Sequence, residues 1–526
     1  MAYFPPFLLL LSLSWASSAA STESSFRECM LTQVGSDSII LSSSSSVYTQ
    51  VLEFSQQNPR WLNSSRKPVL IITPVHESEI QVAILCSRKH ELQVRVRSGG
   101  HDYEGLSFLS DTPFIIIDLI YLRSIEINLA EETAWVQAGA TLGELYYKIA
   151  NLSKVHGFPA GLCPSVGLGG HVSGGGFGTM LRKFGLAADN VLDAYLIDVN
   201  GKLLDRQAMG KDLFWAIRGG GGGSFGIVLA WKIRLVRVPA TVTAFTVERT
   251  DQEGATKLIH RWQYIANKLH EDLFIRIIAQ KLGRSGQGIK ASFNSLFLGG
   301  KDKLIPLMKQ SFPELGLQAK DCIEMSWIQS ILYFAGYHKD DHPELLLNRI
   351  TSYKSFYKAK SDFVNEPVSE TALEGVWKMF QEEDVLTLLI ADPYGGRMDE
   401  ISESATPFPH RKGNIYNIQY MIKWDVNNYE AENRHVQWIR KLYRYMTPYV
   451  SKSPRSAYVN YRDLDIGTNK HSNTSYSEAS VWGKKYFKGN FRRLAHIKTK
   501  VDPQNFFRNE QSLPILSPVP ASKLRA

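Results

Sequence analysis

The 526-residue sequence lacks features that would indicate several other protein classes. No apolar run reaches the ~18 residues that a membrane-spanning helix needs, so we expect no transmembrane segment. No internal repeat is present, which disfavours a solenoid. Acidic and basic residues are interleaved along most of the chain, so the formal net charge of +9 is not concentrated in one part. The chain has ordinary globular composition, with 44% hydrophobic and 21% charged residues, and is long enough for two or more domains.

The densest basic stretch, residues 484–500, also contains Tyr486, Phe487 and Phe491. Basic residues interleaved with aromatic ones are one signature of a nucleic-acid-binding surface. The same pattern is typical of a solvated helix face close to an anionic cofactor, and we favour this interpretation. We therefore expect no nucleic-acid partner. The modest positive charge suits an acidic extracellular matrix instead.

Residues 1–20 have the pattern of a secretory signal peptide, although they contain no Lys or Arg. A short apolar run is followed by small residues, as in a region that is cleaved on export. Three Asn-x-Ser/Thr sequons, at Asn63, Asn151 and Asn473, agree with passage through the secretory pathway. We predict a glycoprotein that is secreted, with the cell wall as one destination, or vacuolar.

Because disulfides form in the secretory pathway, the predicted export makes the four cysteines informative. We predict a disulfide between Cys29 and Cys86, which would tie the N-terminal segment to the first half of a sheet. Cys322 lies in a helix-like stretch and is interpreted as a buried hydrophobic residue. Cys163 lies in a glycine-rich loop, where a bystander thiol would be at risk of oxidation. A disulfide between Cys163 and Cys322 is the competing interpretation.

From residue 68 onward, strand-like and helix-like segments alternate. The first two predicted strands flank a helix, which indicates a βαβ unit. Beyond Pro239 the glycine-rich loops stop, and the pattern predicts a second, antiparallel α+β domain. We expect strands over 69–72, 94–97, 114–119, 192–199, 227–235, 242–249, 274–282, 290–298 and 413–424, and helices over 77–90, 255–269 and 303–311.

Two glycine-rich loops each place a nucleophilic side chain beside backbone suited to holding phosphate. The first is Arg97-Ser98-Gly99-Gly100-His101-Asp102-Tyr103, directly after a strand, and the second runs from Gly161 through Cys163 to Gly178. Residues 167–178 include seven glycines in twelve positions. Converging backbone N–H groups bind pyrophosphate, and glycine permits close approach. Neither loop has the Gly-x-Gly-x-x-Gly pattern of a Rossmann fold, so nicotinamide binding is disfavoured.

With these loops the chain resembles the plant berberine bridge enzyme-like flavoproteins of the vanillyl-alcohol oxidase superfamily, over residues 68–514. The resemblance implies FAD held by two covalent bonds, from the His101 imidazole to the flavin 8α carbon and from the Cys163 sulfur to C6. Two bonds would raise the flavin potential and anchor it in an open cleft. We expect contacts to the cofactor from Arg97, Ser98, Gly99, Gly100, His101, Cys163, Val166, Gly167, Gly170, His171, Gly174, Gly175, Gly176, Gly178, Ile227 and Val228.

The resemblance also implies a fold of the α+β class. We expect a two-lobed FAD-binding domain of the PCMH type, an antiparallel-sheet substrate domain, and a C-terminal segment that returns to the FAD domain. The chain is expected to be a monomer. The expected divisions are a signal peptide over 1–20, an N-terminal segment over 21–66, the FAD-binding domain over 67–240, the substrate domain over 241–455 and the returning segment over 456–515.

Val166, three residues after Cys163, matches a position that in this family resembles an oxygen gate. A valine leaves room for dioxygen next to the flavin, whereas a bulkier side chain accompanies dehydrogenase behaviour. We therefore expect an oxidase that reduces dioxygen to hydrogen peroxide. The alternative is a valine that serves only in packing, because one methylene is a small steric difference.

The predicted strand 413–424 places Asn417, Gln419 and Met421 on one face, since side chains alternate along a strand. In the family, such a strand covers the reacting side of the flavin. Gln419 is an amide, so it positions the substrate by hydrogen bonds and is not a base. Tyr461 is the predicted base, and its phenol pKa of ~10 must be lowered for that role. Tyr103 is a second predicted active-site tyrosine.

Two departures from the family pattern bear on the reaction. Asn417 replaces a lysine that assists the tyrosine in relatives that oxidise alcohols, and Phe177 replaces a common tyrosine. The leading hypothesis is an FAD-linked oxidase of a small-molecule plant metabolite, of alkaloid or prenylated phenolic type, with ring closure as a further outcome. The alternative is a cyclase of Diels–Alder type that retains the flavin without net oxidation. A binding or defence protein with vestigial catalysis is a third interpretation.

Overall fold

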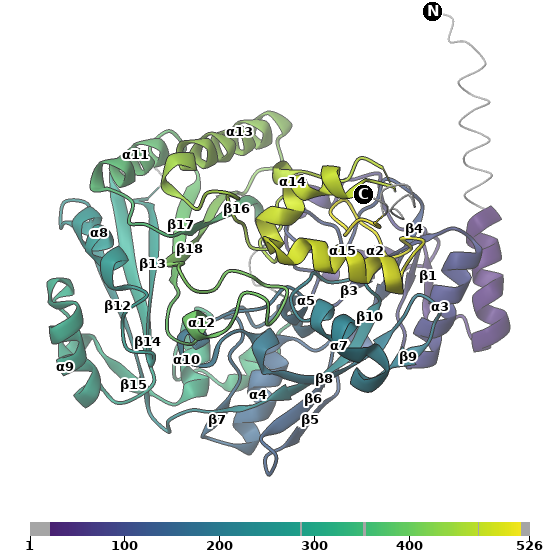
Figure 1. Cartoon of the computed structure of the whole chain (residues 1–526), viewed down its shortest axis with the longest axis horizontal. Coiled ribbons are helices and arrows are strands. Elements are labelled where there is room, and N and C mark those ends of the chain that lie inside the picture. Colours follow the sequence, from purple (N-terminus) through teal and green to yellow (C-terminus); the bar gives the residue numbers. More distant parts are fainter. Residues whose placement is uncertain (1–20, 284–286, 351–353, 472, 517–526) are drawn as a thin grey trace, which may run out of the picture.

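The structure, a computed structural model, describes residues 21–283, 287–350, 354–471 and 473–516. This part of the chain contains three main β-sheets, of four, five and seven strands, with helices that cover their faces. Figure 1 shows the seven-stranded sheet on one side of the molecule and the two smaller sheets on the other. The mixture confirms the predicted α+β class. No helix of the described residues is long and apolar enough to cross a membrane, and the predicted signal peptide lies outside them.

The four-stranded sheet contains the predicted βαβ unit. Its strand order is β1-β2-β4-β3, and both β2 and β3 run parallel to β4. A disulfide between Cys29 and Cys86 joins the helix over residues 21–34 to α3, as predicted. The strands and the crossover helix are β1 (Ile40–Ser42), β2 (Leu70–Ile72), β3 (Gln93–Arg97), β4 (Phe114–Asp118) and α3 (Glu77–Lys89).

The five-stranded sheet is antiparallel and has the order β5-β6-β10-β8-β9. The chain between β6 and β8 leaves the sheet and forms the second glycine-rich loop, with short helices on either side. The elements are β5 (Ile125–Asn128), β6 (Thr133–Gln137), β8 (Val191–Ile197), β9 (Leu203–Leu204), β10 (Ile227–Arg234), α4 (Leu142–Leu152), α5 (Leu168–Ser173), α6 (Leu181–Phe184) and α7 (Arg206–Ile217).

The seven-stranded sheet is fully antiparallel, with the order β15-β12-β14-β13-β17-β18-β16. Alternate residues such as Phe245, Ile277 and Ile418 form a core with α8, α9, α11 and α13, which cover the outer face in Figure 1. The other face is directed towards the side of the molecule that holds the two smaller sheets. The elements are β12 (Val242–Thr250), β13 (Leu273–Lys281), β14 (Ile289–Phe297), β15 (Ile323–Met325), β16 (Phe356–Val364), β17 (Leu386–Pro393), β18 (Tyr416–Trp424), α8 (Ala255–Ile265), α9 (Lys301–Ser311), α10 (Trp327–Phe334), α11 (Glu370–Phe380) and α13 (Tyr429–Tyr445).

The prediction of a helix around Cys322 is wrong. Cys322 lies between a 3₁₀ turn and β15, which pairs with the start of β12. This long-range pairing overrides the local helical pattern. The thiol is buried, as expected, and donates to the Gln318 carbonyl at 3.6 Å. Both Cys163 and Cys322 are free thiols, so the competing disulfide between them is also wrong.

The C-terminal segment forms α14 (Tyr476–Phe487) and α15 (Asn490–Val501), and α15 packs against α7. These two helices contain the basic stretch 484–500. Lys498 is fully buried and donates to Asp502 at 2.6 Å, while Arg493 pairs with Asp212 of α7 at 2.8 Å. These bonds give part of the basic stretch a structural role within the protein.

Two buried arginines join the region of the seven-stranded sheet to the segment between the second glycine-rich loop and β8. Arg411, which is fully buried, forms a bidentate ion pair with Asp189 at 2.7 and 2.8 Å. Arg182 lies on α6 and donates to the carbonyls of Ala266, directly after α8, and of Leu273 on β13, at 2.8 and 3.0 Å. Since buried carbonyls and carboxylates need partners, these contacts fix how the sheet faces the glycine-rich loops.

Candidate active site

The two glycine-rich loops contact each other directly. A Cβ atom on Gly99 would lie 2.2 Å from the Gly167 nitrogen, and a Cβ on Gly167 would lie 2.1 Å from Ser98 Oγ. Ser98 Oγ donates to the Ala138 carbonyl at 2.6 Å, which fixes the first loop on the five-stranded sheet. The loops that sequence reasoning treated as two separate phosphate cradles therefore form one continuous backbone surface.

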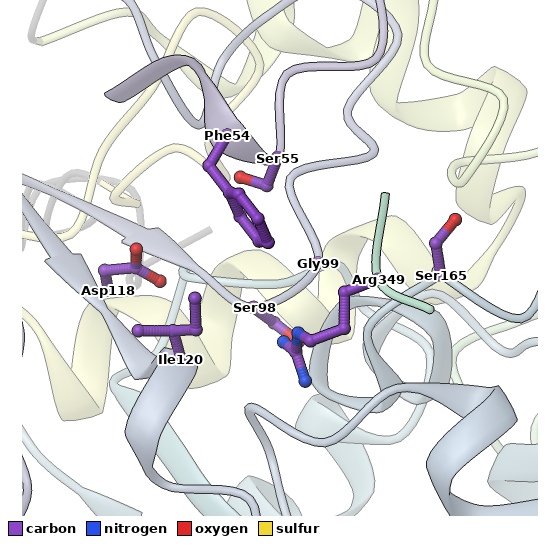
Figure 2. Close-up of a pocket in the computed structure, with 8 residues that line it drawn as sticks. All are labelled: Phe54, Ser55, Ser98, Gly99, Asp118, Ile120, Ser165 and Arg349. Atoms are coloured by element: carbon purple, nitrogen blue, oxygen red, sulfur yellow. The ribbon is translucent and has the colours of Figure 1, made fainter. Parts of the chain in front are cut away.

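A small pocket opens beside this contact. Figure 2 shows the Arg349 guanidinium next to Ser98, in a pocket that also contains parts of both loops. Arg349 donates to Glu144 at 2.7 Å and to the Gly139 carbonyl at 2.9 Å. A cation beside converging loop backbone suits an anionic group such as pyrophosphate. The lining residues are Phe54, Ser55, Ser98, Gly99, Asp118, Ile120, Ser165 and Arg349.

Arg97 directly precedes Ser98, and it is not among the residues that line the pocket. The guanidinium forms a buried ion pair with Asp118 at 2.6 Å and donates to the carbonyls of Val51 and Leu52. These bonds connect β3 to β4 and to α2 (Tyr48–Phe54). Arg97 thus holds the first loop through protein partners, and its predicted contact with a cofactor stays a prediction.

His101 of the first loop and Ser165 of the second loop form another contact between the two loops. His101 Nε2 lies 3.2 Å from Ser165 Oγ. Burial lowers the pKa of His101 to about 4, although a hydrogen bond to the Ser165 backbone opposes this shift. At neutral pH the imidazole is therefore uncharged and keeps a nitrogen lone pair, which is the form needed for nucleophilic attack.

Cys163 has an exposed side chain, yet protein surrounds it closely enough for burial to raise its pKa. A side chain with both properties lines an internal space. Arg276 and Lys423 oppose the effect of burial on the Cys163 pKa, so positive charge from the seven-stranded sheet acts on this thiol. The surroundings fit a ring system that is placed between Cys163 and the sheet and takes a bond from sulfur.

The later glycines of the second loop contact protein groups. His171 Nε2 accepts from the Gly161 N–H at 3.0 Å, and a Cβ on Gly176 would lie 2.4 Å from the His171 ring. A Cβ on Gly174 would lie 1.9 Å from Asn460 Oδ1, and one on Gly178 would lie 1.9 Å from the Ala160 carbonyl. The structure thus gives Gly174, Gly176 and Gly178 a packing reason, and cofactor contact by them, and by the buried Gly175, stays a prediction.

An aromatic cluster lies next to the first loop. The rings of Tyr103 and Tyr461 stack with centroids 5.7 Å apart and planes 8° apart. Gln419 Nε2 lies 2.6 Å from the Tyr103 hydroxyl, which joins β18 to the loop of His101. Phe177 and Tyr458 pack edge-on against Tyr461. Three of the predicted active-site side chains, Tyr103, Tyr461 and Gln419, are thus brought together, with Phe177 beside them.

β18 presents the predicted face towards this cluster. Asn417 and Gln419 are both nearly fully buried, and Met421 is partly exposed. The amide of Asn417 has no hydrogen-bond partner within the described residues at either Nδ2 or Oδ1. Buried amides without partners are rare in proteins, so this orphaned group indicates a place where a bound molecule or water completes the site.

Sequence reasoning missed Arg276 and Asp392. Arg276 on β13 forms a bidentate ion pair with Asp392 on β17, at 2.6 and 3.0 Å. A charged residue in the middle of the apolar strand Leu273–Lys281 was the signal that could have found Arg276. Burial raises the pKa of Tyr461 well above its usual value, Asp392 adds to this, and Arg276 opposes it. A base at Tyr461 requires a lowered pKa, and the described residues by themselves do not lower it.

The comparisons with known proteins agree with this geometry. Residues 68–206 match the "FAD binding domain" family and residues 457–514 match "Berberine and berberine like". The chain is 58% identical to berberine bridge enzyme-like 22 of Arabidopsis thaliana over 477 residues, 90% of each protein. It is 52% identical to a tetrahydroberberine oxidase of Berberis wilsoniae over 524 residues, 98% of each. The chain belongs to the berberine bridge enzyme-like family. It is an FAD-dependent oxidoreductase.

Solved structures of relatives have the same fold as this chain. The berberine bridge enzyme of Eschscholzia californica matches with a TM-score of 0.89 at 41% identity, over 94% of this chain and 100% of that one. Phl p 4, a grass pollen allergen with glucose dehydrogenase activity, matches with a TM-score of 0.89 at 47% identity and the same coverage. These matches confirm the predicted PCMH-type architecture of the berberine bridge enzyme-like fold.

The remaining predicted residues lie around the site. Val166 is partly buried and packs against the core that includes Leu142 and Leu168. Gly170 is exposed, with open space where a Cβ would project. Ile227 and Val228 begin β10, Ile227 in the core and Val228 partly exposed. Contact of these residues with FAD in this berberine bridge enzyme-like protein stays a prediction.

Proposed function

We propose that the chain is an oxidase whose FAD is bound through both His101 and Cys163. The observation that carries this proposal is the placement of an uncharged imidazole and an accessible thiol on two loops that form one backbone surface. The histidine would take the 8α position and the cysteine C6. When bound, the flavin accepts hydride from the substrate and passes the electrons to dioxygen.

The protein would supply orientation and proton transfer. Tyr461 is the proposed base, because its hydroxyl forms no hydrogen bond with any described residue and lies within reach of the Arg276 charge. Gln419 would act as a positioning group that holds Tyr103 and the substrate. Asn417, with both amide atoms free of described partners, would complete the substrate contacts.

Dioxygen is the proposed electron acceptor because of the small side chain at Val166. Wild-type Phl p 4 is a glucose dehydrogenase, and an isoleucine-to-valine variant of it is a glucose oxidase. In that relative, the loss of one methylene accompanies the change of activity. The same steric reasoning, applied to Val166, favours hydrogen peroxide as a product of this chain.

A plant specialised metabolite of alkaloid or prenylated phenolic type is the proposed substrate. Two relatives with 52% and 48% identity are tetrahydroberberine oxidases, which supports an alkaloid. The chain is proposed to reach the cell exterior or the vacuole as a glycosylated monomer. The sequon residues Asn63, Asn151 and Asn473 are all exposed, as glycan attachment requires.

A non-redox cyclase is the second candidate, and the Asn417 site favours it. Where alcohol-oxidising relatives are expected to have a lysine, position 417 has an uncharged amide without a partner among the described residues. The test mixes the yellow holoenzyme with candidate metabolites without oxygen. The oxidase proposal predicts that a substrate bleaches the flavin absorbance, whereas turnover to a cyclised product with the absorbance unchanged would favour the cyclase.

A further inference from the structure

A buried network of charged side chains lies on one face of β16, opposite to the face that Gln419 occupies on β18. Lys358 and Lys360 of β16 pair directly with Ile422 and Tyr420 of β18, whose side chains belong to the helix-covered core. Since residues directly opposite one another in a sheet share a face, both lysines are on the helix-covered side. Their side chains are almost fully buried. The network consists of Lys358, Lys360, Glu104, Asp463 and Asp465.

Lys358 joins two segments that each contain a tyrosine of the candidate site. Its ammonium group donates to Glu104, the residue directly after Tyr103. It also donates, at 2.9 Å, to Asp463, two residues after Tyr461. The rings of Tyr103 and Tyr461 stack with centroids 5.7 Å apart. One cation is therefore bonded close to both members of the stacked pair.

Lys360 has similar burial and the same chemistry, but it has different partners. It donates to Asp463 at 2.6 Å and to Asp465 at 2.8 Å, and both carboxylates are in the segment of Tyr461. Among the described residues it bonds to none in the first glycine-rich loop or at Glu104. Lys358 is therefore the lysine of the network that connects both segments.

The charge of Lys358 matters because buried carboxylates lie around it. Burial alone would lower the pKa of Lys358, but the carboxylates, above all Glu104 and Asp463, raise it above its usual value. The ammonium group is therefore charged at neutral pH. Without it, Glu104 would keep the Leu464 N–H, at 3.3 Å, and would face Asp463 with no cation between them. Because like charges repel, loss of Lys358 should move the two segments apart.

We propose that Lys358 is a positioning residue, which keeps the Tyr103 and Tyr461 rings stacked by fixing the segments that contain them. Desolvation offsets much of the attraction within a buried ion network, so a fixed geometry is the effect we expect from it. Arg462 also pairs with Asp102, at 2.9 Å, and this pair should keep the segments associated when Lys358 is removed. The catalytic part of the proposal rests on the proposed function, in which Tyr461 is the base.

The first test is hydrogen–deuterium exchange of the holoenzyme, with mass spectrometry of peptides that cover residues 101–105 and 458–465. Lys358→Met removes the cation and should speed exchange in both peptides, because the contact between the segments is weakened. Lys360→Met is the matched control, since it lies on the same strand and face, and it should speed exchange in 458–465 only. Lys358→Arg restores a cation between the carboxylates and should return exchange in 101–105 towards the wild-type rate.

The second test mixes the holoenzyme with tetrahydroberberine, an alkaloid of the proposed substrate class, without oxygen and follows the flavin absorbance. Lys358→Met should slow flavin reduction by about 10–100-fold, because a small displacement of a reacting group has effects of this size. Lys360→Met should slow it less. In a Tyr461→Phe background, Lys358→Met should have no further effect if it acts through Tyr461, whereas a general loss of structure would slow both backgrounds equally.

Unchanged exchange in residues 101–105 of Lys358→Met, or equal changes there in Lys358→Met and Lys360→Met, would overturn the proposal. Slowing by Lys358→Met that is as large without the Tyr461 hydroxyl as with it would do the same. If Lys358→Met does not fold, Glu104→Gln weakens the same link from its other end and has the same expected results.

A failure of the proposed function would appear differently. The wild-type flavin would stay oxidised with the alkaloid, or Tyr461→Phe would be reduced at the wild-type rate. The exchange measurement needs no substrate, so in that case it decides by itself whether Lys358 positions the two segments.

Discussion

Gly99 and Gly167 lie so close together that neither position has room for a side chain. The hypothetical Cβ of each would lie 2.2 Å from the backbone nitrogen of the other. Gly167 has an ordinary φ of −72°, so the requirement for glycine there is one of space and not of backbone conformation. This contact joins the loop of His101 to the loop of Cys163, so the spacing of both proposed attachment points depends on it.

Gly167→Ala should therefore separate the loops and release the flavin. We expect purified G167A to have a much lower ratio of flavin absorbance to protein absorbance than the wild type. Gly489→Ala is the matched control, because Gly489 also precedes a helix with an ordinary φ, of −65°, and nothing lies within 4 Å of its hypothetical Cβ. The interpretation is contradicted if G489A and G167A lose flavin to the same extent.

The two proposed bonds should be separable by substitution. His101→Ala and Cys163→Ala should each leave flavin in the acid-precipitated pellet, and the double variant should release it all to the supernatant. Because the pKa of the Cys163 thiol is raised, little thiolate is present at neutral pH. In His101→Ala loaded with FAD, bond formation should therefore become faster as the pH rises. Pellets of the double variant that remain yellow would show another attachment site.

The proposed base can be tested by the pH dependence of flavin reduction. Since burial raises the pKa of Tyr461, the reactive phenolate fraction should increase with pH through the alkaline range. Stopped-flow reduction of the wild type should rise accordingly, and Tyr461→Phe should be slower by about 10²–10⁴-fold with no such rise. Tyr357→Phe removes another hydroxyl that packs near Tyr103 and should retain the alkaline rise. A rising profile in Tyr461→Phe would assign the base to a different group.

Local patterns in the sequence were sufficient to predict most strands and the two loops. Periods of two and of three to four residues follow from backbone geometry, so β18 and α3 were expected within a few residues of their observed bounds. The ion pair of Arg276 and Asp392 was not predictable, because it depends on the order β13-β17 in the sheet. Cys322 was misassigned for the same reason, since an edge pairing with β12 decides its conformation.

Dioxygen reactivity should depend on the size of the side chain at position 166. Val166→Ile adds one methylene next to the proposed flavin site, where Val166 is only partly buried. We expect the reduced flavin of this variant to reoxidise more slowly in air, while an artificial electron acceptor restores turnover. Leu168→Ile changes shape but not volume at a buried neighbour and serves as the control. Unchanged reoxidation in Val166→Ile would mean that Val166 has a packing role only.

The relative placement of the sheets should depend on the buried pair of Arg411 and Asp189. In the wild type the Arg411 guanidinium contacts both carboxylate oxygens of Asp189, at 2.7 and 2.8 Å. Removing the guanidinium leaves this almost fully buried carboxylate without its partner. Arg411→Leu should lower the free energy of unfolding by about 3–5 kcal/mol, measured by denaturant titration of the holoenzyme. Arg397→Leu breaks an exposed pair with Glu400 and should cost less than about 1 kcal/mol. Equal losses in the two variants would show that the buried pair does not hold the sheets together.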